Sequence, residues 1–216
     1  MEPGITWYSQ SSIRIEAGDM QIYIDPYHLP DGEPEADVII ISHEHGDHLS
    51  PDDIKRVRSG KTVVFANKTA REQLDGDVKL LKPGDSAEAG SLKIRAIPAY
   101  TTTKLRPSGE ATHPKEAEHL GLILEIDDLT FYAAGDTDVI PEMDSVGPVD
   151  YAFLPVSGKY VMTPEEAAEA ARIVRPSVAI PVHFGSIVGS VDDAKRFAEL
   201  VPDQVRVWIM TPSGTD

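Results

Sequence analysis

A short segment of the chain concentrates side chains that bind metal ions. It contains three histidines and two carboxylates within six residues: His43, Glu44, His45, Gly46, Asp47 and His48. An apolar run over residues 38–41 ends just before it, and such a run predicts a short buried strand. Because the chain has no cysteine, imidazole and carboxylate are the ligand types left for a first-row metal. We therefore predict a metal site at the end of a strand.

The spacing within this segment suits a pair of metal ions. His43 and His45 are two residues apart, so they point to the same side of an extended chain. Gly46 lets the backbone turn, so that Asp47 and His48 face back toward them. We therefore expect His43 and His45 to hold one metal, and Asp47 and His48 to hold a second.

Three other apolar runs also end in ligand-type side chains, which are Asp25, Asp136 and His183. The ends of strands in α/β folds are where ligands collect, because the scaffold fixes positions there while the loops leave room for a substrate. We predict that these tips converge on the histidine-rich segment, and that Asp25 orients the histidine ligands from behind.

The elements that must position these residues alternate between strands and helices, as in α/β proteins. The chain opens with an antiparallel meander over residues 5–8, 12–15 and 20–24. Capping residues predict helices that start after Ser50, Asn67, Thr163 and Ser190. The remaining predicted strands cover residues 38–41, 61–66, 78–81, 91–98, 120–126, 129–134, 150–154, 178–182 and 205–209. Residues 99–118 show no period and predict a long loop, functional or disordered.

Composition limits the classes of function. The 216 residues, with 41% hydrophobic and 26% charged side chains, predict one soluble domain over residues 1–216. A net charge of −16, from 20 basic and 36 acidic residues, would repel a polyanion, so we expect no nucleic-acid partner. We find neither a membrane-spanning run of about 20 apolar residues nor a secretory signal, and predict a cytoplasmic protein without a membrane partner. Whether it forms a homo-oligomer stays open.

The histidine-rich segment resembles a known signature. Its pattern matches the His-x-His-x-Asp-His motif of the metallo-β-lactamase superfamily, and the segments around Asp25, Asp136 and His183 resemble later parts of that family. The resemblance spans nearly the whole chain and is greatest to the branch of small metal-dependent hydrolases that includes the ascorbate-6-phosphate lactonase. It implies a four-layer αβ/βα sandwich with the metals in a cleft along its edge.

The resemblance also implies a set of ligands. They are His43 and His45 for the first metal, Asp47, His48 and His183 for the second, and Asp136 as a bridge between the two. Of these, we predict that Asp47, His48 and Asp136 carry the catalysis. Zinc suits imidazole-rich sites, while manganese or iron suits a mixed set with carboxylates.

One histidine of the family pattern lacks a counterpart at its usual place. Residues 96–101, just after a predicted strand, contain no histidine, whereas the loop contains His113 and His119 follows it. We predict His113 as the remaining ligand, because a loop residue can fold over the cleft. His119 is the alternative, and we expect it to be a surface histidine. We expect Glu44 to be a solvated or hydrogen-bonded acid rather than a catalytic base.

The function that this site implies is hydrolysis. Two divalent metals and a bridging hydroxide would act on a small ester, lactone or phosphorylated substrate. The alternatives are a phosphodiesterase or nuclease of the same fold, which the charge disfavours, and a non-catalytic metal-binding or ligand-sensing protein. Lys104, Arg106, Lys159 and Tyr160 are candidates to bind an anion in the cleft, or are simply exposed.

Overall fold

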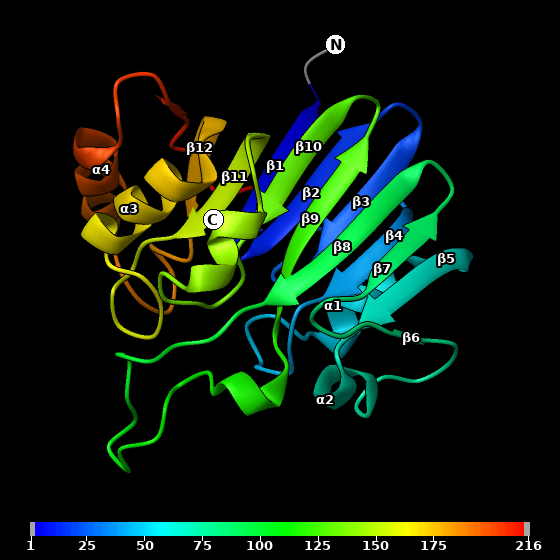
Figure 1. Cartoon of the computed structure of the whole chain (residues 1–216). Coiled ribbons are helices and arrows are strands. Elements are labelled where there is room, and N and C mark those ends of the chain that lie inside the picture. The colour runs from blue at the N-terminus through cyan, green and yellow to red at the C-terminus, as the bar shows by residue number, and fades with distance from the viewer. Residues whose placement is uncertain (1–2, 214–216) are drawn as a thin grey trace.

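Two β-sheets packed face to face form the centre of the protein (Figure 1). The computed structural model describes residues 3 to 213. In the first sheet the strands follow in order β1 (Gly4–Ser9), β2 (Ser12–Ala17), β3 (Met20–Ile24), β4 (Ala36–Ile41), β5 (Arg58–Ala66) and β6 (Lys79–Leu80). In the second the order is β13 (Arg206–Val207), β12 (Pro176–Val182), β11 (Val149–Pro155), β10 (Leu129–Ala133), β9 (Leu120–Ile126), β8 (Leu92–Pro98) and β7 (Ser86–Ala89).

Both sheets are mixed, and their parallel parts bring strand ends together. The strands β1, β2 and β3 form the predicted antiparallel meander, after which β3, β4 and β5 run parallel. In the second sheet β9 and β10 form the predicted hairpin, and β10, β11 and β12 run parallel. Because parallel strands end at the same edge of a sheet, the carboxyl ends of β3 and β4 lie together, as do those of β10 and β12.

Helices cover the outer faces of the two sheets. They are α1 (Pro51–Val57), α2 (Lys68–Arg71), α3 (Pro164–Val174) and α4 (Val191–Leu200), with 3-10 helices η1 (Lys115–Ala117) and η2 (Pro141–Ser145). Helices α1 and α2 pack on β5, and Figure 1 shows α3 and α4 beside β11 and β12. The predicted caps are present, including a capping box at α3 in which Thr163 and Glu166 satisfy each other's backbone N–H. Of the helices within residues 3 to 213, none combines the length and apolar character needed to cross a membrane.

The strand that carries the histidine-rich segment is buried on both faces. Val38 and Ile40 of β4 belong to the core between the two sheets, whereas Ile39 and Ile41 belong to a second core under α1. Alternate side chains of a strand point to opposite faces, so β4 contributes to both cores at once. This confirms the predicted order of layers, helix, sheet, sheet and helix.

Some differences from the predicted elements lie at the sheet edges, and in addition β5 starts at Arg58 instead of residue 61 and η2 was not predicted. Strand β7 was not predicted, and β13 is shorter than the predicted 205–209. Edge strands bury few side chains, so their sequences carry little of the apolar pattern that marks a central strand. The long loop is largely irregular, as predicted, with η1 and a single bridge between Leu105 and Ala111 within it.

Candidate metal centre

Four strand ends position the predicted ligands. The segment His43–His48 follows β4, Asp25 follows β3, Asp136 follows β10, and His183 follows β12. Asp25 and His183 both have positive φ angles, 47° and 59°. Non-glycine residues seldom adopt this left-handed conformation, and they cluster at functional sites when they do. The backbone therefore turns sharply as soon as each of these two strands ends.

Three imidazoles from distant parts of the chain converge on Asp136. Its Oδ2 lies 3.2 Å from Nε2 of His113 and 3.3 Å from Nε2 of His183. Its Oδ1 lies 3.3 Å from Nε2 of His48. The carboxylate therefore lies between two groups of ligand atoms, since Oδ2 faces His113 of one group and His183 of the other, and Oδ1 faces His48.

The first group contains three imidazoles. His45 Nδ1 is 3.1 Å from Nε2 of His43 and 3.1 Å from Nε2 of His113. The second group contains a carboxylate and two imidazoles, since Asp47 Oδ2 is 3.5 Å from Nε2 of His183 and 3.9 Å from Nε2 of His48. All the predicted ligands are thus brought together, and their ligand atoms face one another.

Several of these atoms lack ordinary hydrogen bonds although they are buried. His48 Nε2, His183 Nε2 and Asp136 Oδ1 have no hydrogen-bond partner in the described part of the chain. Leaving a buried polar atom unpaired is costly, and a cation between them would satisfy all three. The donor set of imidazole and carboxylate is also the one that first-row metals prefer, so the residues fit a metal centre.

A second layer of hydrogen bonds orients the ligands. Asp25 Oδ2 is 2.8 Å from His48 Nδ1 and accepts from Ser42 Oγ at 2.6 Å, and its Oδ1 accepts from Ser42 N at 2.7 Å. Ser42 Oγ is also 2.9 Å from His43 Nδ1. These contacts support the predicted orienting role of Asp25. Sequence reasoning missed Ser42, although it directly precedes the cluster.

His183 has its own orienting partner. Ser157 Oγ lies 3.2 Å from Nδ1 of His183. Ser157 follows β11, the strand between those that carry Asp136 and His183. No signal in the sequence pointed to Ser157, because the contact depends on the pairing of β11 with β12.

Burial and neighbouring charges determine which ligands are ionised. Burial holds the pKa of His43 well below its usual value and lowers that of His45 to about 4. Burial acts on His183 in the same direction, but the Asp136 carboxylate outweighs it and raises the pKa of His183 to about 9. Burial alone would raise the pKa of Asp136, but His183 and His48 hold it well below its usual range. At neutral pH, His43 and His45 are therefore neutral, as metal ligands must be.

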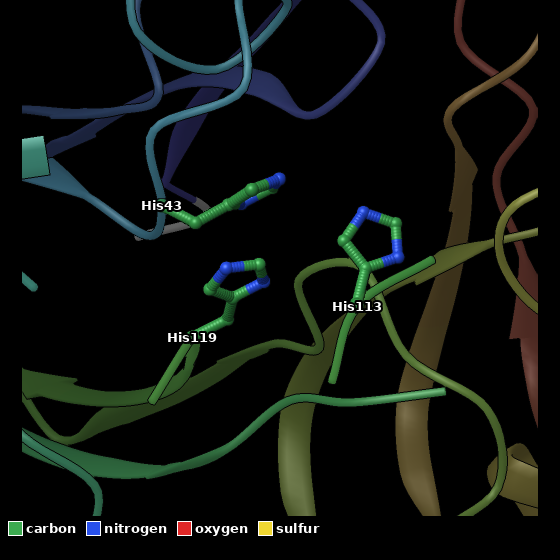
Figure 2. Close-up of side chains that lie close together, drawn as sticks. All are labelled: His43, His113 and His119. Carbon is green, nitrogen blue, oxygen red and sulfur yellow. The ribbon is translucent and has the colours of Figure 1, made fainter. Parts of the chain in front are cut away.

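The expectation that His119 lies on the surface is wrong. Its side chain is 2% exposed, and its ring stacks on that of His43 with centroids 4.5 Å apart. Figure 2 shows His43, His113 and His119 lying close together. Ala99 N donates to His119 O, and Leu120 N donates to Ser42 O. The first bond holds the start of β9 against the end of β8 and the second holds it against the end of β4, so His119 lies in the interior.

His119 faces a different partner from His113. Its Nε2 is 3.3 Å from Oε2 of Glu44, which also accepts a hydrogen bond from Thr69 Oγ1 at 2.5 Å. Burial alone would raise the pKa of Glu44, but these contacts lower it to about 2. Glu44 is thus a hydrogen-bonded acid, in line with its expected role. His113, in contrast, points Nε2 at His45 and Asp136.

A pocket opens above the ligands, with a volume of about 380 Å³. Its floor consists of the ligand residues His45, Asp47, His113, Asp136 and His183. Its other lining residues are Tyr27, Gly46, Thr112, Tyr160, Ile187 and Val188. Tyr160 therefore reaches the cleft, whereas Lys104, Arg106 and Lys159 do not line it. The site can hold a small molecule directly over the ligand atoms.

Comparisons with known proteins agree with this geometry. Residues 4–183 match the beta-lactamase superfamily domain. A UPF0173 metal-dependent hydrolase from Ligilactobacillus salivarius is 31% identical, over 94% of each chain. Another, from Methanopyrus kandleri, is 28% identical over 96% of each chain. The crystal structure of a proposed metal-dependent hydrolase from Parabacteroides distasonis has a TM-score of 0.87 and 36% identity, and the match covers 98% of this chain and 94% of the other. None of these three relatives is described with a substrate. The resemblance to the lactonase branch therefore stays a prediction.

Proposed function

This chain belongs to the metallo-β-lactamase superfamily and is a metal-dependent hydrolase of it, and we propose that it cleaves a small ester, lactone or phosphorylated substrate at a centre of two divalent metal ions. One observation carries the proposal. Among residues 3 to 213, the buried atoms His48 Nε2, His183 Nε2 and Asp136 Oδ1 have no hydrogen-bond partner, and they face one another across a few ångströms. Such an arrangement costs stability unless a cation occupies the space between these atoms.

The two groups of ligand atoms divide the residues between two metal ions. In our assignment His43, His45 and His113 hold the first metal, and Asp136 reaches both. The second metal belongs to Asp47, His48 and His183. We assign His113, because its Nε2 approaches both His45 Nδ1 and Asp136 Oδ2. His119 is the alternative ligand, because its ligand atom lies within 4.8 Å of those of His43 and His113, although its Nε2 is also 3.3 Å from Glu44 Oε2.

The chemistry of the site follows from its ligands and the groups behind them. Divalent metals in a site of this kind polarise the scissile bond and make hydroxide available at neutral pH. Zinc is favoured because most of the ligands are imidazoles, and manganese or iron also suits the mixed set. Asp25 and Ser42 hold the rings of His48 and His43 in the orientation that aims their Nε2 atoms into the site. The pocket above excludes bulk water from one side of a bound substrate.

Two other functions are compatible with a metal centre. A phosphodiesterase or nuclease would have to attract a polyanion, which the net charge of −16 opposes. A non-catalytic metal or ligand sensor would bind metal without turnover. Cytoplasmic location, the absence of nucleic-acid and membrane partners, and a single domain over residues 1–216 stay predictions.

Metal analysis and a substrate panel test the proposal together. We expect the purified protein to bind two divalent metal ions per chain and to hydrolyse at least one member of a panel of an ester, a lactone, a phosphodiester and a β-lactam. Replacing Asp47 by alanine should reduce that turnover more than about a hundredfold, because it removes a ligand of the second metal. Asp203→Ala, at an exposed aspartate, is the matched control. A protein that binds no divalent metal, or an Asp47→Ala variant with intact turnover, would refute the hydrolase assignment.

A further inference from the structure

We propose that the substrate is a carboxylic ester or lactone whose remaining part is an uncharged, apolar chain, and that Tyr27, Tyr160, Ile187 and Val188 bind this chain. This proposal names the substrate class of the hydrolase and rests on the function proposed above. It narrows the substrate class by excluding phosphorylated and other anionic metabolites. The evidence is that polar, ligand-type residues line the floor of the pocket, whereas apolar and aromatic residues line its wall.

The wall of the pocket is apolar and comes from three separate segments. Tyr27 follows β3, Tyr160 lies before α3, and Ile187 with Val188 follows β12. The side chains of Ile187 and Tyr160 are 54% and 36% exposed, which is unusual for large apolar residues. Apolar side chains that gather around a polar floor typically bind the hydrocarbon part of a ligand.

The turn after β12 holds two of these residues beside the ligands. Gly185 N donates a hydrogen bond to Val188 O at 3.1 Å. This closes the chain into a turn that starts at His183, whose Nε2 faces Asp136. The turn thus places Ile187 and Val188 in the lining of the same pocket as the predicted ligands, where they can contact a substrate bound there.

No lysine or arginine lines the pocket among residues 3 to 213. The cations of the neighbouring loop already have partners. Lys104 Nζ is 2.7 Å from Glu166 Oε2 and 3.3 Å from Asp138 Oδ1, and Arg106 Nη2 donates to Thr112 O at 3.1 Å. Lys159 is exposed, with Nζ placed 4.9 Å from the centre of the Tyr160 ring.

An anionic group on the substrate would therefore be poorly accommodated. A remote phosphate or carboxylate that entered the pocket would leave water without a lysine or arginine among the lining residues to pair with, which is costly. The net charge of −16 also lowers the local concentration of anions around the molecule. Binding of an alkyl or aryl chain carries neither cost. Its contact with the exposed parts of Ile187 and Tyr160 removes apolar surface from water, which is favourable.

Two esters of equal length test this discrimination. We compare 4-nitrophenyl butyrate with the mono-4-nitrophenyl ester of succinic acid, which has the same number of acyl carbons and ends in a carboxylate. After correction for hydrolysis in buffer, kcat/KM should be at least about tenfold higher for the butyrate. Each methylene added between acetate and butyrate should raise kcat/KM about fourfold, the value expected for a buried CH₂. A preference for the succinate ester would overturn the inference and leave the hydrolase function standing.

A positive charge placed in the wall should weaken the preference for the uncharged ester. Ile187→Lys adds a cation at an exposed position, so the fold should tolerate it. We expect it to reduce the preference for the butyrate about tenfold or more. Leu80→Lys adds the same charge at an exposed residue of β6, outside the pocket, and should leave the preference unchanged. Equal preferences in all three proteins would contradict a role for Ile187 in binding.

A binding measurement separates the failure of this inference from the failure of the proposed function. Hexanohydroxamate and the monohydroxamate of adipic acid both present a metal-binding group on a six-carbon chain, and only the second carries a carboxylate. Calorimetric titration of the metal-loaded protein should show at least about tenfold tighter binding of the uncharged compound. If no member of the substrate panel is hydrolysed but this difference appears, the hydrolase function fails and the preference of the pocket for an uncharged chain stands. Equal or tighter binding of the anionic compound overturns the inference.

Discussion

Replacing Asp25 by asparagine should weaken one metal ion selectively. Asparagine has the size of aspartate and tolerates the left-handed conformation that Asp25 adopts, with φ of 47°. Its amide oxygen can still accept from Ser42 N, in the place of Oδ1. Its amide nitrogen then takes the place of Oδ2 and meets His48 Nδ1, which lies 2.8 Å from Oδ2 in the native protein. Two donors cannot share that contact, so the proton of His48 moves to Nε2, the atom that should bind the metal.

The size of the effect follows from the contact that is lost. A hydrogen bond to a charged group contributes about 1.5–3 kcal/mol, and loss of a partner behind a metal-binding histidine typically weakens metal affinity by about 10–100-fold. These figures agree, since a tenfold change in affinity corresponds to about 1.4 kcal/mol. We expect the affinity for the metal at His48 to fall by about 10–100-fold. The metal at His43, His45 and His113 should lose less affinity, because the amide oxygen still accepts from Ser42 N and only the acceptor of Ser42 Oγ changes.

Competition titration against a chromophoric chelator measures the two affinities separately. Asp53→Asn is the matched control, because Asp53 is also a buried carboxylate that accepts from backbone N–H groups, those of His28 and Leu29. It has no contact with the ligands, and its substitution should reduce stability while leaving both affinities unchanged. An Asp25→Asn variant that binds both metals like the wild type, or that loses both equally, would refute the reasoning.

Three further predictions concern the ligands and the backbone beneath them. His113→Ala should lose one of two metal ions by elemental analysis while His119→Ala keeps both; the reverse result would exchange the two assignments. In the metal-free protein His183 has a pKa of about 9, above the usual 6.5, so the stability it adds is complete below pH 6.5 and disappears as pH rises through about 9. Urea titrations should then show a loss of at most about 3 kcal/mol over that range, absent when metal is bound; a flat profile without metal would contradict this. Gly135→Ala should destabilise the protein by more than about 1 kcal/mol, because φ is 67° and the added Cβ would lie 2.6 Å from Leu120 O; an unchanged urea midpoint would be inconsistent with that clash.

The sequence predicts those parts of the site that depend on local patterns. The histidine-rich segment, Asp136 and His183 each follow an apolar run, and an apolar run identifies a central strand by itself. Parallel pairing then places their ends at one edge. The four layers, in contrast, were implied by the resemblance of the histidine-rich segment to a known family, and the structure adds a physical reason, since β4 is apolar on both faces and is covered on both.

The parts that were not predictable depend on contacts between distant segments. His119 is buried because the start of β9 is bonded to the end of β4, and its own neighbours in the sequence carry no sign of this. Ser157 contacts His183 only after β11 and β12 pair. The sharp turn at Asp25 is likewise invisible in the sequence, because aspartate adopts a positive φ only where the surrounding structure holds it there.

The double burial of β4 has a consequence for how this protein can change. Side chains on both of its faces are locked in cores, so the residues that follow it have almost no freedom to move. The wall of the pocket, by contrast, is made of residues in connecting segments, such as Tyr160 and Ile187, which bear little of the packing. The residues that we propose to bind metal and those that form the wall of the pocket therefore differ in how tightly the fold packs them. Substitutions in these connecting segments should therefore change the substrate preference while leaving the predicted metal ligands in place.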